Sequence, residues 1–137
     1  MATLQTAEGL QVRALEVSDL CVTATGAANA GVTLTIPAAG AGLFHYITSI
    51  IIQRTATAAL VGSATLVITT TNLPGSMAYS VGNAMAAGGT QNDLNLCLTG
   101  NPLKSSVANT ATTIVCPVPG AAVLWRITAT YFAKAGV

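Results

Sequence analysis

Apolar and small polar residues alternate along much of this chain. The alternation is clearest in three segments, residues 32–36, 92–98 and 123–131. Because successive side chains of a β-strand point to opposite faces, a period of two predicts strands with one buried face and one outward face. Strands of this kind are typical of antiparallel sheets that cover a core on one side only.

The same pattern recurs from residue 20 onward, and short connections rich in Gly, Ala, Asn and Pro separate its segments. We expect strands at residues 20–25, 31–36, 43–54, 63–71, 77–81, 91–98, 103–108, 111–116 and 122–133. Eight or nine short strands, spaced by roughly ten residues, predict an all-β fold: an antiparallel β-sandwich that is jelly-roll-like.

Residues 1–19 differ from the rest of the chain. They hold four of its nine charged residues and fit neither a clean helical pattern nor a clean strand pattern. We therefore expect an N-terminal arm over residues 1–19 and a β-sandwich domain over residues 20–137. Two interpretations of the arm stay open: a segment that docks on a neighbouring molecule, and a frayed terminus or edge strand.

The expected strand at residues 43–54 is apolar on both faces. On strict alternation, one face carries Phe44, Tyr46, Ile50 and Ile52, and the other carries Leu43, His45, Ile47 and Ile51. A strand that is apolar on both sides must be covered on both sides. Since the core of a two-layer sandwich covers only one, we expect either another subunit or the chain's own arm to cover the second.

The second face of this strand predicts a homo-oligomer. Arg54 and Arg126 are added to the expected contact because arginine is frequent at interface hot spots, and Val67 because it is apolar on the outward side of its strand. The candidate subunit interface is Leu43, His45, Ile47, Ile51, Arg54, Val67 and Arg126. Trp125, on the face opposite Arg126, is expected to fill the core.

Charge and catalytic chemistry are nearly absent. Only 7% of residues are charged, the formal net charge is +1, and His45 is the single histidine. This composition argues against a basic groove for nucleic acid. No Gly-x-Ser-x-Gly elbow, glycine-rich nucleotide motif or cluster of metal ligands occurs in the sequence. We predict a protein that is not an enzyme, with no catalytic residues, cofactor, metal or small-molecule substrate.

The membrane and redox signals are equally weak. No run of about twenty apolar residues predicts a spanning helix, and the first residues do not resemble a signal peptide, so we expect no membrane association. The spacing of Cys21, Cys97 and Cys116 matches no metal-binding pattern. We expect free thiols, although a Cys21–Cys97 or Cys97–Cys116 bridge stays open.

Three blocks of the sequence resemble small virion proteins of tailed bacteriophages, of the capsid decoration (cement) type. These blocks are residues 44–50 (FHYITSI), residues 70–75 (TTNLPG) and residues 104–113 (KSSVANTATT), followed by a closing strand that contains Trp125. The resemblance extends over about residues 43–131 and does not include the arm.

The resemblance implies a non-enzymatic structural protein that binds the outside of the phage head. It implies a jelly-roll-like sandwich, a homotrimer, the major capsid protein as partner, and a place on the capsid surface after synthesis in the host cytoplasm. The candidate capsid-contacting residues are those of the arm: Glu8, Leu10, Arg13, Glu16 and Asp19. Two other classes stay open, a receptor- or carbohydrate-binding module of a fibre or tail adhesin and a secreted trimeric jelly roll.

Overall fold

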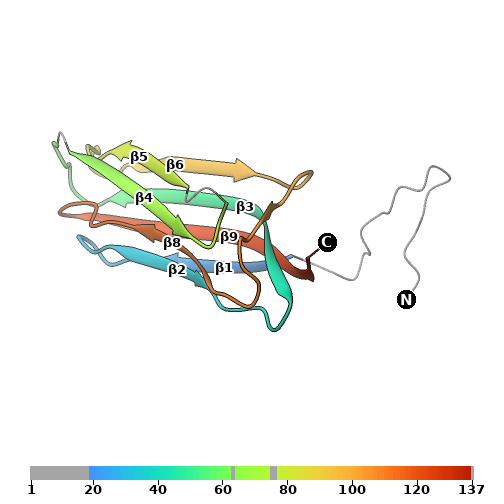
Figure 1. Ribbon diagram of the computed structural model, residues 1–137. Helices are drawn as coiled ribbons and strands as arrows, with labels where there is room; N and C mark the ends of the chain where they lie inside the picture. The colour runs from blue at the N-terminus through green and yellow to red at the C-terminus, as the bar shows by residue number, and fades with distance from the viewer. Residues whose placement is uncertain (1–18, 63, 75–76, 137) are drawn as a thin grey trace.

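Nine β-strands form two antiparallel sheets that face each other in the computed structural model, which describes residues 19–62, 64–74 and 77–136 (Figure 1). The strands are β1 (Leu20–Thr25), β2 (Val32–Ile36), β3 (Leu43–Ala56), β4 (Thr65–Thr71), β5 (Ala78–Gly82), β6 (Thr90–Cys97), β7 (Leu103–Lys104), β8 (Thr112–Cys116) and β9 (Val123–Ala135). The predicted β-sandwich is confirmed. The arm residues Glu8, Leu10, Arg13 and Glu16 lie outside the described residues.

The strand order is that of a jelly roll. One sheet has the order β1-β9-β3-β6, with β7 beside β3, and the other has the order β2-β8-β4-β5. Apart from the β4–β5 hairpin and the two-residue β7, consecutive strands alternate between the sheets, as in a double Greek key. The first described strand therefore pairs with the last, and β1 forms one edge of its sheet (Figure 1).

Most predicted strand boundaries agree with the observed ones to within two residues, and the strand expected at 103–108 is the exception. Only Leu103–Lys104 pairs with β3. Ser105 still donates its backbone N–H to the carbonyl of His45, at 2.8 Å, but Ser106 turns away to the carbonyl of Asn72, at 3.0 Å. The segment after β7 is therefore hydrogen-bonded to a neighbouring loop at this end of the sandwich instead of extending the sheet.

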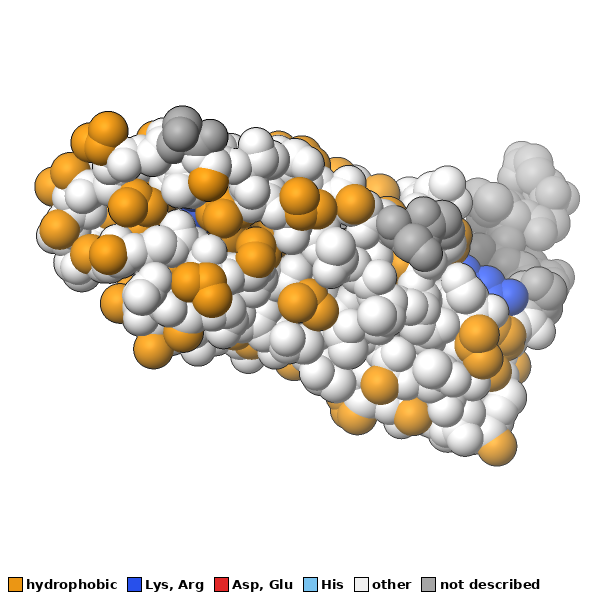
Figure 2. Space-filling view, turned by 60° about the vertical axis from the view of Figure 1, so that its left-hand side comes forward, with side chains coloured by type: hydrophobic (Ala, Val, Ile, Leu, Met, Phe, Trp, Pro, Cys, Tyr) orange, Lys and Arg blue, Asp and Glu red, His pale blue; other side chains and the backbone are white. Residues whose placement is uncertain are grey.

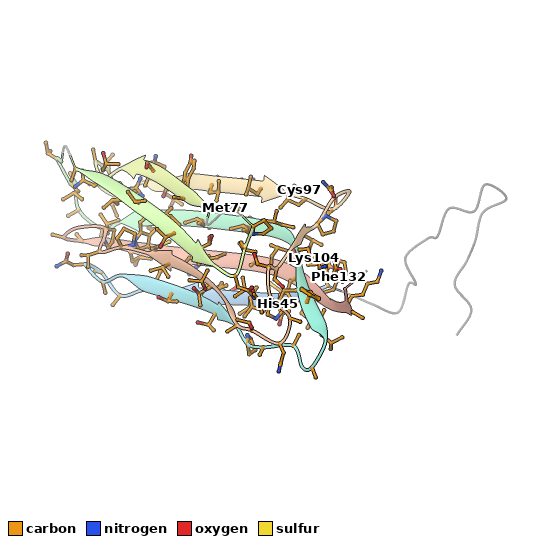
Figure 3. The ribbon with its side chains drawn as sticks, viewed as in Figure 1. His45, Met77, Cys97, Lys104 and Phe132 are labelled. Carbon is orange, nitrogen blue, oxygen red and sulfur yellow. The ribbon has the colours of Figure 1, made fainter. Side chains whose placement is uncertain are left out.

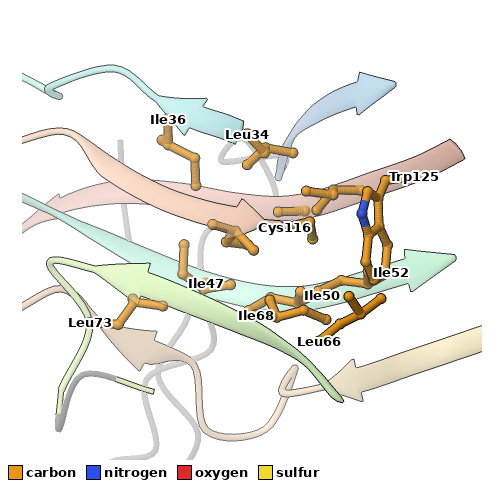
Figure 4. Packing of buried hydrophobic residues seen from close by; sticks show 13 residues of the cluster. Leu34, Ile36, Ile47, Ile50, Ile52, Leu66, Ile68, Leu73, Cys116 and Trp125 are labelled. Carbon is orange, nitrogen blue, oxygen red and sulfur yellow. The ribbon is translucent and has the colours of Figure 1, made fainter. Parts of the chain in front are cut away.

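The core lies between the two sheets and is almost wholly aliphatic (Figure 4). Leu34 and Ile36 of β2 face Ile50 and Ile52 of β3, and all four are at most 1% exposed. Trp125 is fully buried among them and donates its indole N–H to the Pro117 carbonyl at 2.7 Å. The expectation that Trp125 fills the core is confirmed.

A β-bulge at Thr48 changes the faces of β3. The pairing of β3 with β9 shifts between Ile47 and Ser49, so Thr48 is an extra residue opposite β9. An extra residue moves every following side chain to the other face. As a result His45 and Ile47 share the core face with Ile50, whereas Ile51 points outward. The predicted division of this strand into faces is therefore wrong beyond the bulge.

Candidate functional site

The residues predicted to form a subunit interface do not share one surface. His45, Ile47 and Arg54 are 1%, 1% and 0% exposed and lie in the chain's own core. The prediction that these three residues contact another subunit is therefore wrong. Because of the bulge at Thr48, the alternating buried positions before and after it all face the core. The remaining predicted residues are placed separately: Ile51 and Arg126 on the outer face of the β1-β9-β3-β6 sheet, Val67 on the outer face of the other sheet, and Leu43 half-buried at the start of β3.

Arg54 forms a buried ion pair with Asp93. Its Nε and Nη2 donate to the two carboxylate oxygens at 2.6 and 2.7 Å, and both side chains are fully buried. The guanidinium carbon also lies 5.3 Å from the centre of the Trp125 ring. Two parallel hydrogen bonds to one carboxylate, with an aromatic face beside them, compensate most of the loss of water around the buried guanidinium.

A second β-bulge places this carboxylate inside. The pairing of β3 with β6 shifts between Ile52 and Gln53, and Asp93 is the additional residue of β6. Strict alternation puts Asp93 on the polar side of its strand with Asn95, so the sequence pattern did not reveal the pair. The one signal available was that Arg54 and Asp93 are each the single charged residue of an expected strand, and Lys104 and Arg126 share that property.

Burial makes the Cys116 thiol unreactive. The pKa of Cys116 is raised from 9.0 to about 12, chiefly because the thiol is removed from water and also because the Asp93 carboxylate lies near it, while Arg54 acts in the opposite direction. The thiol therefore keeps its proton at neutral pH, and a protonated, buried thiol is a poor nucleophile.

The two other cysteines are exposed, and all three are free. Strand pairing places Cys21, Thr130, Ser49 and Cys97 in one row across the outer face of the β1-β9-β3-β6 sheet. Three interstrand spacings of about 4.8 Å separate Cys21 from Cys97, roughly twice the Cα separation that a disulfide allows. The alternative of a Cys21–Cys97 bridge within one chain is therefore wrong.

His45 is a structural residue at one end of the sandwich. Its Nε2 donates to the Pro37 carbonyl at 2.9 Å, and its Nδ1 is hydrogen-bonded to the Thr112 hydroxyl at 2.8 Å. Its backbone N–H donates to the Ser105 hydroxyl at 3.0 Å. Both ring nitrogens are hydrogen-bonded to groups of neighbouring segments, so His45 links the loops at this end of the sandwich.

Asn72 completes the same network. Its backbone has a φ of 57°, a conformation that asparagine tolerates better than most residues. Its side chain accepts from the Val107 N–H at 2.8 Å and donates to the carbonyls of Val107 and Thr110 at 3.2 and 3.0 Å. The three blocks 44–50, 70–75 and 104–113 thus meet at one end of the molecule, a convergence that the sequence alone did not show.

An aromatic–lysine patch lies on the outer sheet face at this end, and we define it as Phe44, Tyr46, Lys104, Phe132 and Lys134. Tyr46 pairs with Lys104 on one side and Phe132 on the other, and Phe44 pairs with Lys134. The Tyr46 and Phe132 rings are stacked with centroids 5.1 Å apart, and the Lys104 ammonium lies 4.0 Å from the centre of the Phe44 ring. Figure 3 shows Lys104 and Phe132 near the point where β9 ends.

The described connections at the opposite end of the sandwich contain no charged residue. Four connections meet there, residues 26–31, 57–62, 83–89 and 117–122, and none contains Asp, Glu, Lys, Arg or His. Backbone hydrogen bonds between Leu60 and Met85, at 2.9 Å in both directions, join two of them. Val61 and Val118 are 97% and 55% exposed, and hydrophobic side chains dot this end in Figure 2. We call this surface the charge-free end.

The described residues contain no cluster of metal ligands, and they line a small apolar cavity. Among them, no group of three or more His, Cys, Asp or Glu side chains is close enough to hold a metal ion. An apolar slot beside β5, lined by Ile52, Ile68, Met77 and Leu94 among others, has a volume of about 10 Å³. That volume suits about one water molecule and not a metabolite.

Comparison with known proteins leaves the function open. No protein-family model matches the chain, and no match was found among curated proteins or solved structures. Across residues 19–62, 64–74 and 77–136, no helix is long and apolar enough to cross a membrane. We therefore infer a function from the arrangement of this chain's own surfaces.

Proposed function

We propose that this protein is a non-enzymatic structural protein of a tailed-phage particle, a decoration protein that binds the outside of the head as a homotrimer. The observation that carries the proposal is the distribution of charge. Broad, nearly uncharged sheet faces connect a charge-free end to an end with a lysine-bearing patch. The described residues of such a molecule present chemically distinct contact surfaces.

The outer face of the β1-β9-β3-β6 sheet is suited to contact with a second copy of the chain. Its hydroxyl and amide groups are already paired across the strands, as Thr23 with Thr128 at 3.2 Å and Ser49 with Thr130 at 2.6 Å. Burying polar groups costs less when they are already hydrogen-bonded. Ile51, half-buried in the middle of this face, supplies apolar area for the contact.

A decoration protein gains strength from repetition rather than from one tight site. Each copy needs only modest contacts, because a trimer that engages several lattice points at once binds with an avidity well above its single-site affinity. The tightly linked loops at both ends suit this role, since preorganised surfaces lose little conformational entropy on binding.

The proposal is tested by reconstitution on particles. Heads of the phage that encodes the chain are prepared from a deletion strain, mixed with the purified protein, and sedimented. We expect the protein to sediment with the heads at saturation and to raise the temperature at which they release DNA. Protein that stays in the supernatant at saturating concentration contradicts the proposal.

A further inference from the structure

We infer that the aromatic–lysine patch is a docking surface for a carboxylate-rich protein surface. The inference deepens the proposed function and rests on it for the identity of the partner, the outer surface of the phage head. The binding of carboxylates to the patch, however, is tested on the purified protein without phage heads.

The two lysines of the patch lack acidic partners within the described part of the chain. Its carboxylates are Asp93, which is held by Arg54, and Asp19, which accepts a hydrogen bond from the Thr48 hydroxyl at 2.8 Å. Neither Lys104 nor Lys134 forms an ion pair among residues 19–62, 64–74 and 77–136. A complementary partner therefore brings negative charge.

The patch is also held in place, which favours a contact surface over a loose solvated face. β7 fixes Lys104 beside Tyr46, and the hydrogen bonds of Ser105 to His45 lock the residues that follow. The cation–π contact with Phe44 holds the Lys104 ammonium near the surface instead of letting it extend into water. A charge fixed in this way loses less side-chain entropy when it pairs.

The aromatic rings favour an acidic protein over a nucleic acid or a sugar. Tyr46 and Phe132 stack on each other with an interplanar angle of 3°, so one face of each ring is covered by the other ring. The Lys104 ammonium covers one face of Phe44. Bases and sugars bind to open aromatic faces, whereas carboxylates need only the ammonium groups that the patch presents.

The direct test uses poly-L-glutamate as the probe and isotope-labelled protein observed by NMR at about 20 mM salt, where surface charges are weakly screened. We expect amide shifts that concentrate on the patch residues and their strand neighbours, and that fade at about 300 mM salt. Shifts of equal size elsewhere on the surface, or none, overturn the inference. A larger response to oligothymidylate or to neutral dextran also overturns it, in favour of a nucleic acid or a glycan.

Matched variants assign the effect to the lysines. Lys104→Gln with Lys134→Gln should weaken poly-L-glutamate binding on the order of tenfold, since two exposed pairs are removed. Lys104→Arg with Lys134→Arg should keep it, and Arg126→Gln, which removes an exposed cation of the same sheet face outside the patch, should change it little. An equal loss in the Arg126 variant overturns the inference.

The same variants separate this inference from the proposed function. If poly-L-glutamate binds at the patch but wild-type protein does not bind phage heads, the proposed function fails and the chemistry of the patch stands. If wild-type protein binds heads and the double Gln variant binds them equally well at low salt, the docking role of the patch fails and the proposed function stands.

Discussion

At the scale of the residue, a buried ion pair stands where the sequence predicted a surface contact. Arg54 and Asp93 are both removed from water, so the pair stabilises the fold only because each charge compensates the other. Replacing one partner leaves an uncompensated charge in the core, whereas replacing both with apolar residues of similar volume does not.

Asp93→Asn should therefore lower the free energy of unfolding by about 3–5 kcal/mol. The double replacement Arg54→Met with Asp93→Leu should recover most of that loss. Urea denaturation followed by tryptophan fluorescence measures both, because Trp125 lies against the pair. A loss in Asp93→Asn below about 1 kcal/mol, the range of an exposed pair, contradicts the buried pair.

The raised pKa of Cys116 predicts a loss of stability in alkali. The native thiol keeps its proton up to a pKa of about 12, while the thiol of the unfolded chain ionises from about 9.0. The stabilisation is thus complete below pH 9.0 and is lost as the pH rises toward 12, by at most about 1.4 kcal/mol per pH unit.

Cys116→Val serves as the matched control, because it removes the titration and keeps the apolar packing. Thermal unfolding from neutral pH upward should show a steeper decline for the wild type than for this variant. Parallel declines in the two proteins show that Cys116 does not ionise differently in the native and unfolded states.

At the scale of the element, the two bulges decide what faces the core. Deleting Thr48 should bring β3 and β9 back to regular pairing and move His45 and Ile47 to the outer face. We expect this deletion to abolish cooperative unfolding, because His45 also ties Pro37 and Thr112 together.

Thr48→Ser is the control for that deletion, since it keeps both the extra residue and a hydroxyl for Asp19. Hydrogen exchange of β3 amides compares the two proteins. Strong protection of β3 in the deletion variant, equal to that of the serine variant, contradicts the role given to the bulge.

The sequence predicted the strands better than it predicted their faces. Alternation in segments such as 123–131 requires only local information, and those strands appear almost where expected. In β3 both faces are largely apolar on either side of Thr48 and Ser49, and this pair of polar residues does not by itself show that the strand changes face there. The bulges at Thr48 and Asp93 depend on which strand lies alongside, and the pairing partners are remote in sequence.

The candidate surfaces were predictable only in part. The resemblance drew attention to the blocks around Phe44, Asn72 and Lys104, but their meeting at one end depends on the jelly-roll order of strands. The aromatic–lysine patch joins residues from β3, β7 and β9, and no single segment contains its pattern.

At the scale of the whole molecule, Ile51 tests whether the uncharged sheet face joins copies of the chain. Ile51→Asp places a charge in the middle of that face and should shift the native mass from trimer to monomer. Because the side chain points outward, the melting temperature of the monomer should change little. Thr128→Ser on the neighbouring strand is the control, and native mass spectrometry is the measurement. A wild-type protein that is already monomeric contradicts the proposed trimer.

The most direct test of the central proposal is the copy number of this protein in intact, gradient-purified particles of the tailed phage that we propose encodes it, measured by mass spectrometry with labelled peptide standards. A decoration protein should be present in a fixed ratio to the major capsid protein, with one trimer for each equivalent lattice position. Absence from the particles contradicts the account, and so does a copy number matching tail components, which indicates an adhesin.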